Sequence, residues 1–266
     1  ATVPRVRVVT WNVNSLKMRM PRILQFIETH RPDVLLLQET KTPPDAFPDR
    51  ELADAGYHAV HHSAGRWAGV ALLARRELTL EDPVLSLPGD PVPEEARWCE
   101  ATIAGIRMAS VYVPNGRSLD SPEYPRKLAF LDAMSARIGE LQGAAGEDAV
   151  IVAGDMNIAP ADADVYDPSA FEGGTHVSAA ERGRLGQILE NGMVDAYRAL
   201  HPGEVQFTWW DYRAGHFHKG LGLRIDLALL SAPLAERLTA CGIDRNFRKG
   251  SKPSDHAPLL LDLAGA

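Results

Sequence analysis

The sequence predicts a four-layered α/β sandwich, in which two mixed, mainly antiparallel sheets are flanked by helices. Three observations support this fold class. Strand-like apolar stretches recur along the whole chain, and stretches with helical periodicity separate several of them. Four of the strand-like stretches follow one another closely, which favours antiparallel hairpins. The stretches at 34–37 and 150–153 are entirely apolar, as expected of buried strands.

The first quarter of the chain begins the alternation of strands and helices. Residues 6–13 are rich in β-branched side chains and form the first predicted strand. Residues 20–30 follow as a helix, because their apolar side chains recur on one helical face. Pro32 ends this helix, and residues 34–37 form the second strand.

Four predicted strands then lie close together, at 57–62, 69–74, 98–103 and 106–113. Ala104 and Gly105 form a good two-residue turn between the last two strands, which we therefore expect to pair as a hairpin.

The second half predicts further helices and strands. The helices lie at 128–141, 178–190 and 233–240, and the strands at 150–153, 223–230 and 257–263. Asn191-Gly192 suits the end of the second helix. The third helix begins after Ser231 and ends near Gly242. The run from Gly143 to Gly146 is a short loop rather than a linker, so residues 1–266 are predicted to form one domain.

The composition is that of an ordinary soluble globular protein. Of the 266 residues, 45% are hydrophobic and 24% are charged. No apolar run reaches the roughly 18 residues that a membrane helix needs, and residues 1–7 lack the apolar core of a signal peptide. Cys99 and Cys241 lie far apart and form no CxxC pair, which favours free cytoplasmic thiols over a disulfide or a zinc site.

Polar side chains recur where the apolar strands end. The set comprises Asn12 and Asn14, Gln38 and Glu39, Asp155 and Asn157, Asp226, and Asp255 with His256. Residues two apart on a strand face the same side, so the pairs Asn12/Asn14 and Asp155/Asn157 are each predicted to face one cleft. Any single residue of this kind is more often a turn former or a hydrogen-bonded structural acid. Five such positions in one chain favour an active site at a sheet edge.

The residue types in this set indicate a particular chemistry. Carboxylate and amide oxygens without cysteine are the ligands that magnesium and manganese prefer. A single histidine beside acids suits phosphate contact or proton transfer better than a zinc site, which usually takes three or four protein ligands. The set therefore predicts metal-assisted hydrolysis of a phosphoester.

Seven segments, in their order along the chain, carry a specific resemblance. They are TWNVNSLKMR, PDVLLLQETK, VYVPNG, AGDMNIAP, FTWWDYR, GLRIDLAL and KPSDHAPL. Together they resemble the exonuclease III family of apurinic/apyrimidinic endonucleases, within the endonuclease/exonuclease/phosphatase superfamily. The likeness runs from about Val6 to Leu263 and implies a DNase I-like fold.

The resemblance implies a role for each matching residue. Glu39 would be the principal ligand of Mg²⁺, with Asn12 beside it and Asp255 completing the acids on the metal side. Asp155 would orient or deprotonate the attacking water, and Tyr112 would lie at the phosphate or leaving group. The remaining catalytic groups would contact the phosphate, and they are Asn157 and His256, the latter paired with Asp226. The substrate-binding residues would be Asn14, Arg97, Asn115, Trp209, Trp210 and Leu223, the last three forming an apolar pocket for a sugar without its base.

The resemblance also implies a function. The protein would be a DNA-repair phosphodiesterase that cuts 5′ to abasic sites in duplex DNA and has 3′→5′ exonuclease and 3′-end-cleaning activity. It would use Mg²⁺, with Mn²⁺ as the alternative, and act as a monomer in the bacterial cytosol, associated with the nucleoid. Its partners would be DNA duplexes with abasic sites or blocked 3′ ends, and it would not bind a membrane.

Two alternatives remain open. A related phosphodiesterase acting on a lipid or inositol phosphate would need an exposed apolar element for the membrane, and none is evident. A DNA- or protein-binding module with little catalysis would require loss of the catalytic set, and all its members are present.

Charge and sequence departures bear on DNA binding. The net charge of −7 alone argues against a nucleic-acid ligand, yet basic residues gather in the loops between the motifs, and we expect about half of these to face DNA. Ser15 stands where many relatives have glycine, and Trp210 where phenylalanine is common. Residues 164–182, which in the family reach the DNA, show little likeness to the relatives.

Overall fold

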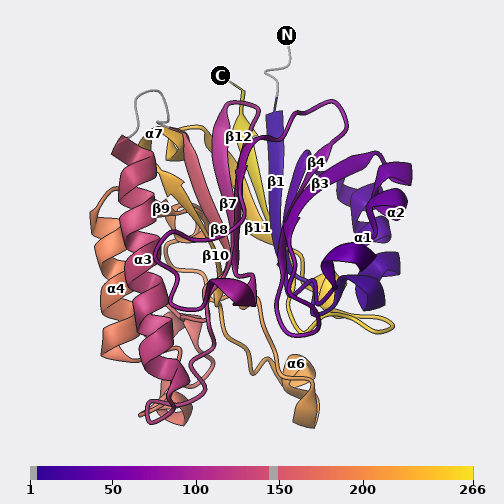
Figure 1. Ribbon diagram of the computed structural model, residues 1–266. Helices are drawn as coiled ribbons and strands as arrows, with labels where there is room; N and C mark the ends of the chain where they lie inside the picture. Colours follow the sequence, from indigo (N-terminus) through magenta and orange to yellow (C-terminus); the bar gives the residue numbers. More distant parts are fainter. Residues whose placement is uncertain (1–4, 144–148, 266) are drawn as a thin grey trace.

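The fold was obtained as a computed structural model, which describes residues 5–143 and 149–265. Two six-stranded sheets pack face to face, with helices on the outer face of each (Figure 1). The predicted four-layered α/β sandwich of two mixed sheets is confirmed. The predicted loop at 143–146 falls largely on residues outside the described ranges.

The first sheet has the strand order β11-β12-β1-β2-β4-β3. Its strands are β1 (Arg5–Asn12), β2 (Val34–Gln38), β3 (Tyr57–His62), β4 (Val70–Arg75), β11 (Leu238–Ile243) and β12 (Leu259–Ala264). The second sheet has the order β5-β6-β7-β8-β10-β9. Its strands are β5 (Glu81–Val84), β6 (Trp98–Ile103), β7 (Ile106–Tyr112), β8 (Val150–Asp155), β9 (Met193–Asp195) and β10 (Asp226–Ser231).

Each sheet contains one parallel pair among its described strands, β1 with β2 and β7 with β8, and its other pairs are antiparallel. Parallel neighbours end at the same edge, so Asn12 lies beside Gln38 and Tyr112 beside Asp155. The start of β1 and the end of β12 lie at the opposite edge (Figure 1).

The helices cover the outer faces of the sheets. Helices α1 (Leu16–His30) and α2 (Asp49–Asp54) lie on the first sheet, and α3 (Glu123–Gly143) and α4 (Ala179–Glu190) on the second (Figure 1). Three apolar cores result, one between the sheets and one beneath each helical layer. The shorter helices are α5 (Ala196–Leu200), α6 (His216–Lys219) and α7 (Ala232–Ala235).

Several predicted boundaries were wrong by a few residues. Helix α1 begins at Leu16 rather than residue 20, because Ser15 caps it and accepts a hydrogen bond from the Met18 amide. Strand β8 continues to Asp155 instead of ending at residue 153. Strand β10 begins only at Asp226, so the predicted strand start at residue 223 was wrong.

The predicted helix at 233–240 was the largest error. Only Ala232–Ala235 is helical, and Leu238–Ile243 forms edge strand β11, paired with β12. Thr239 and Ala240 are exposed, so the segment lacks the apolar run that marked the other strands. The backbone pairing with β12, the next strand of the chain, determines its conformation.

Both cysteines, Cys99 and Cys241, are free thiols, as predicted, and the structure buries both. Within the described residues, no helix combines the length and the apolarity that crossing a bilayer requires.

Candidate active site

The candidate site lies at the edge where both parallel strand pairs end. Asn12 ends β1, Glu39 follows β2, and Tyr112 and Asp155 end β7 and β8. Asp226 begins β10 and pairs with Asp155 in the ladder. A pocket of about 200 Å³ opens there, lined by Glu39, Tyr112, Asn115, Asp155, Asn157, His176, Trp209, Ile225, Asp255 and His256.

Gly154 allows strands β7 and β8 to approach each other closely just before Asp155. A Cβ atom at residue 154 would lie 1.9 Å from the carbonyl oxygen of Val111, so no side chain fits there. The glycine of the GDMN motif therefore maintains the register that places Asp155 between Tyr112 and Asp226.

His256 lies between two carboxylates. Its Nδ1 is 2.7 Å from Asp226 Oδ2, and its Nε2 is 3.6 Å from Asp155 Oδ2. All three side chains are almost completely buried. Burial alone would lower the pKa of His256, but the charges of Asp226 and Asp155 raise it to about 10. At neutral pH His256 is therefore a cation, suited to contact with an anionic phosphate.

Asp155 is buried close to two other carboxylates, those of Asp226 and Glu39. Burial raises the pKa of Asp155 to about 7, with His256 opposing the rise and Asp226 and Glu39 adding to it. A cation bound between Glu39 and Asp155 would lower this pKa and leave Asp155 ionised, as a general base must be.

The donors of the site fit a divalent cation. Among the described residues, Glu39, Asp155 and His256 offer ligand atoms that all lie within 4.8 Å of one another. Because a protonated imidazole cannot bind a metal, the two carboxylates remain, and such hard oxygen donors suit Mg²⁺ or Mn²⁺. The ammonium of Lys41 lies 2.8 Å from Glu39 Oε2, which shows that this carboxylate attracts a cation.

Asn12 lies between Glu39 and Asp155 and is hydrogen-bonded to both. Its amide nitrogen donates to Glu39 Oε1 at 2.8 Å and to Asp155 Oδ2 at 3.0 Å. Its amide oxygen accepts a hydrogen bond from the Asn14 backbone amide. Asn12 thus bridges the acids through its nitrogen, and its role as a metal ligand stays a prediction.

Two further amides line the pocket on the side of β7 and β8. Asn157 donates from Nδ2 to Val113 O at 2.8 Å, and its Oδ1 accepts from Asn115 Nδ2 at 3.3 Å. Tyr112 lies beside them, and burial, together with the charges of Glu39 and Asp155, raises its pKa well above the ordinary value. Its phenol therefore keeps its proton at neutral pH and can act as a donor.

Part of the strained backbone of the described chain lies in and next to the site. Six non-glycine residues there have positive φ angles, and they are Asn14 (45°), Ser15 (93°), Glu39 (50°), Lys41 (49°), Asn157 (50°) and His176 (75°). Such conformations cost about 1–3 kcal/mol each and persist where the surrounding structure holds them, typically at functional sites.

Asp255 lies in the pocket but outside the acid cluster. Its Oδ1 accepts a hydrogen bond from Asn14 Nδ2 at 3.0 Å, and its Oδ2 accepts one from Trp209 Nε1 at 3.0 Å. Both oxygens are therefore already engaged. This geometry makes Asp255 a link between Asn14 and Trp209, and its assignment to the metal side stays a prediction.

Comparison with known proteins identifies the family to which a chain with this site belongs. The model of the endonuclease/exonuclease/phosphatase family matches residues 9–256. The chain belongs to this family. It is 31% identical to exodeoxyribonuclease III of Haemophilus influenzae, over 97% of this chain and 99% of that protein. The predicted resemblance is thereby confirmed.

Solved structures of family members agree with this assignment. The 3′ phosphatase NExo from Neisseria, bound to a product DNA hairpin, shares 36% identity with a TM-score of 0.93, covering 97% of this chain and 99% of that one. An AP endonuclease from Archaeoglobus fulgidus shares 34% identity with a TM-score of 0.90, covering 96% and 98%.

The apolar wall of the pocket differs from the predicted one. Trp209 lines the pocket as expected, and Ile225, which the sequence analysis missed, lies beside it. Trp210 and Leu223 are completely buried in two separate apolar clusters and do not line the pocket. Leu223 forms backbone bridges to Trp209 and Val165, which accounts for its burial away from the site.

His176 is the second pocket residue that the sequence analysis missed. It is the one member of segment 164–182 among the residues that line the pocket. Its Nδ1 lies 2.7 Å from the carbonyl oxygen of Asn157, so the imidazole is held against the amide side of the site. Only the unusual sequence of its segment could have drawn attention to it.

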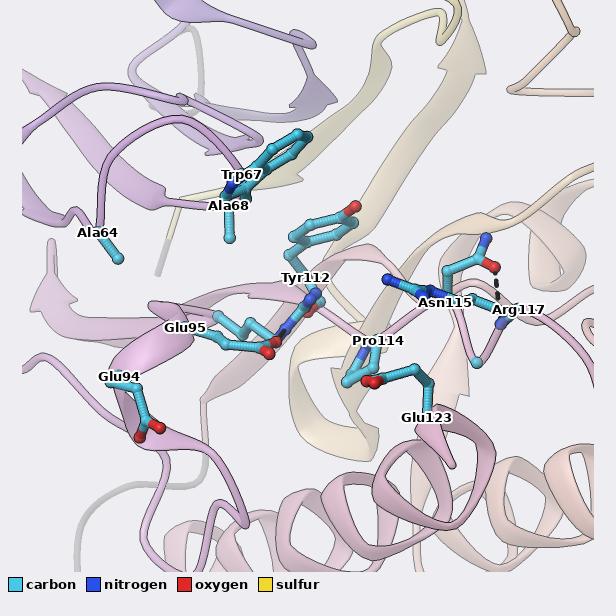
Figure 2. A pocket seen from close by; sticks show the side chains of 12 residues that line it. Ala64, Trp67, Ala68, Glu94, Glu95, Tyr112, Pro114, Asn115, Arg117 and Glu123 are labelled. Atoms are coloured by element: carbon cyan, nitrogen blue, oxygen red, sulfur yellow. Dashed lines mark hydrogen bonds and ion pairs between the residues drawn. The ribbon is translucent and has the colours of Figure 1, made fainter. Parts of the chain in front are cut away.

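A larger outer pocket of about 500 Å³ adjoins the site and shares Tyr112 and Asn115 with it. Figure 2 shows the exposed indole of Trp67 on the same side of this pocket as the Tyr112 ring. The Arg97 guanidinium lies 4.6 Å from the centre of the Tyr112 ring and pairs with Glu95 at 2.6 Å. Arg97 therefore both lines the outer pocket and supports Tyr112.

Proposed function

We propose that this chain is a DNA-repair hydrolase that cuts the backbone 5′ to abasic sites and removes nucleotides and blocking groups from 3′ ends. The observation that carries the proposal is the buried arrangement of Asp226, His256 and Asp155 beside Glu39. Relatives named exodeoxyribonuclease III, 3′ phosphatase and AP endonuclease support it.

Each residue of the site has its own role in the proposed hydrolysis. Asp155 accepts a proton from the attacking water, and His256, kept cationic by Asp226, donates to a phosphate oxygen. Asn157 donates to the same phosphate, and the Tyr112 phenol lies at the leaving-group side. Glu39 would hold Mg²⁺ or Mn²⁺, which would offset the charge that grows on the phosphate.

One observation favours a second candidate function, processing of 3′ ends with weak cutting at internal abasic sites. His176 lines the same pocket of about 200 Å³ as Trp209 and Ile225, so its ring narrows the space that a bare sugar would enter. Two of the similar solved structures are named as a 3′ phosphatase and a 3′-5′ exonuclease.

A four-substrate assay with Mg²⁺ distinguishes these functions. The first three substrates are duplexes that carry an internal abasic analogue, a 3′-phosphate at a nick, or a recessed 3′-hydroxyl. The fourth is an undamaged, closed circular duplex. We expect turnover of the first three and none of the fourth. Turnover of the two 3′ ends alone would establish the second candidate, and no turnover of any DNA would refute the proposal.

His176→Gly is expected to raise the ratio of abasic-site cutting to 3′-phosphate removal by about tenfold or more. The change opens the pocket beside Trp209, and glycine adopts the positive φ of residue 176 without strain. The measurement is kcat/KM on both substrates. His176→Phe is the matched control, because it keeps the ring volume, and its ratio should stay near that of the wild type.

Trp67→Ala is expected to weaken DNA binding about tenfold, because an exposed aromatic ring beside a catalytic pocket is suited to stacking on a base. The Trp67 side chain is 79% exposed in the outer pocket. Fluorescence anisotropy with a duplex in the presence of chelator measures the Kd without cleavage. Leu85→Ala is the control, since Leu85 is also exposed but does not line either pocket. Equal Kd values for both variants would exclude Trp67 from the DNA interface.

We also propose that the protein is a single-domain monomer that works on nucleoid DNA in the bacterial cytosol. The pocket supports the monomer, because side chains of one chain line it on several sides. Sedimentation of the purified protein, alone and with duplex DNA, tests the oligomeric state.

A further inference from the structure

A buried ion pair underlies the amide side of the pocket. Lys127 of α3 and Glu181 of α4 have completely buried side chains, and Lys127 Nζ lies 2.5 Å from Glu181 Oε1. Lysine and glutamate are rarely fully buried, because removing their charges from water is costly. Apolar side chains of similar volume often stabilise a fold equally well or better, so stability alone explains this pair poorly.

The ammonium of Lys127 binds the chain segments that carry the two pocket amides. It donates to the backbone carbonyl of Asn157 at 2.7 Å and to that of Asn115 at 3.1 Å. It also lies 3.1 Å from Thr175 Oγ1. One buried cation thus ties together the loops that follow β7 and β8 and the segment before α4.

The carboxylate of Glu181 holds the backbone around His176. Its Oε1 accepts hydrogen bonds from the His176 amide at 3.0 Å and from Thr175 Oγ1 at 2.6 Å. Its Oε2 accepts from the Ser178 amide at 3.0 Å, which completes the N-terminal cap of α4. The strained backbone of His176 is therefore fixed on both sides.

These contacts also determine the state of the His176 ring. A carbonyl oxygen only accepts hydrogen bonds, so Nδ1 at 2.7 Å from Asn157 O carries a proton. Burial and the nearby charge of Lys127 lower the pKa of His176 to about 4, against the opposing effects of Asn157 and Glu181. The ring is therefore neutral at neutral pH and leaves Nε2 as an acceptor.

We propose that Lys127, paired with Glu181, is a positioning residue for the phosphate and sugar subsites: it fixes Asn115, Asn157 and His176 relative to one another. Lys127 touches no substrate and acts through these three residues. The inference rests on the proposed function, because it assigns the pair to the geometry of the same hydrolytic pocket. Small displacements of groups that contact a reacting phosphate have large kinetic effects.

The double variant Lys127→Met/Glu181→Gln tests the proposal. It removes both charges together, so no unpaired charge is left in the interior and the fold should persist. We expect kcat for 3′-phosphate removal to fall by about 10²-fold, while KM changes less than about threefold, because DNA contacts elsewhere carry binding. A kcat within about threefold of the wild type in the folded variant would overturn the proposal.

A second buried ion pair supplies a control. Its carboxylate, Glu100, also pairs with Arg137, which keeps Glu140 as a partner when Glu100 is changed. Arg107 and Glu100 lie within the second sheet, with Arg107 Nη2 2.6 Å from Glu100 Oε1 and side chains 5% and 0% exposed. Neither residue lines the catalytic pocket. In Arg107→Met/Glu100→Gln we expect kcat to stay at the wild-type value, whatever the change in Tm. A similar loss of kcat in this control would show that any disturbed buried pair slows the enzyme, and would overturn the specific role of Lys127.

A readout independent of activity separates this inference from the proposed function. The ¹⁵N shifts of His176 report its tautomer and its titration. In the wild type we expect a neutral ring with the proton on Nδ1, and in Lys127→Met/Glu181→Gln a raised pKa and mixed tautomers. If the wild type hydrolyses no DNA substrate, the proposed function fails, and the inference is then decided by this titration alone. An unchanged His176 spectrum in the double variant would refute it.

Discussion

Asp155→Asn is expected to lower kcat on the preferred DNA substrate by about 10³-fold, the scale of a lost general base. Asparagine is nearly isosteric and cannot accept the proton of the attacking water. Asp155 accepts one hydrogen bond on each oxygen, from Asn12 Nδ2 on Oδ2 and from the Asn157 amide on Oδ1, and asparagine keeps one of the two. The fold and DNA binding should therefore persist. The measurement is single-turnover cleavage together with the Kd for uncleaved duplex.

Asp226→Asn should also lower activity, but unlike Asp155→Asn it should change how activity depends on pH. Asp226 acts through His256, whose pKa it helps to raise to about 10. Without the charge of Asp226, burial should lower the pKa of His256. As the pH rises, the variant should therefore lose its imidazolium cation, and with it the contact to phosphate, at a lower pH than the wild type does. Activity of Asp226→Asn should therefore recover partly at low pH.

Near-normal turnover of Asp155→Asn would show that the catalytic centre is misassigned.

The sequence was sufficient to predict the clustering of catalytic groups. Asn12, Glu39 and Asp155 stand at the ends of strongly apolar strands, and parallel neighbours must end at the same edge. The pairing of Asp226 with His256 followed from the family resemblance and is present at 2.7 Å. The clustering of Asn12, Glu39 and Asp155 was predictable because local hydrophobic pattern and strand polarity determine it, whereas the pairing of Asp226 with His256 needed the resemblance.

The walls of the pocket could not be predicted in the same way. The predicted strand at 223–230 included both Leu223 and Asp226, but the strand begins only at Asp226. Residues 223–225 instead follow the bridge between Leu223 and Trp209, which buries Leu223 and brings Ile225 to the pocket. His176 was missed because Glu181, buried in an ion pair with Lys127 of a neighbouring helix, holds its backbone amide, and nothing in the sequence marks this contact.

Removal of divalent metal is expected to abolish cleavage, and Glu39→Gln is expected to raise the Mg²⁺ concentration needed for half-maximal rate by about tenfold or more. Glu39 supplies a carboxylate beside Asp155, and each lost anionic ligand weakens a hard cation's binding. Asp155 depends on that cation, because burial, with Glu39 and Asp226, otherwise raises its pKa to about 7. Loss of metal should therefore remove both charge compensation on the phosphate and an ionised base.

Thermal unfolding separates metal binding from catalysis in this test. A ligand that binds only the folded state stabilises it by RT ln(1 + [L]/Kd), so Mg²⁺ should raise the Tm of the wild type more than that of Glu39→Gln. Glu123→Gln is the matched control, since it removes the same charge from the outer pocket and should behave as the wild type does.

Mn²⁺ should restore activity after chelation, because it accepts the same hard oxygen donors. Full cleavage in excess chelator, or equal Mg²⁺ dependence of Glu39→Gln and Glu123→Gln, would remove Glu39 from the metal site and leave Lys41 as its only cationic partner in the described chain.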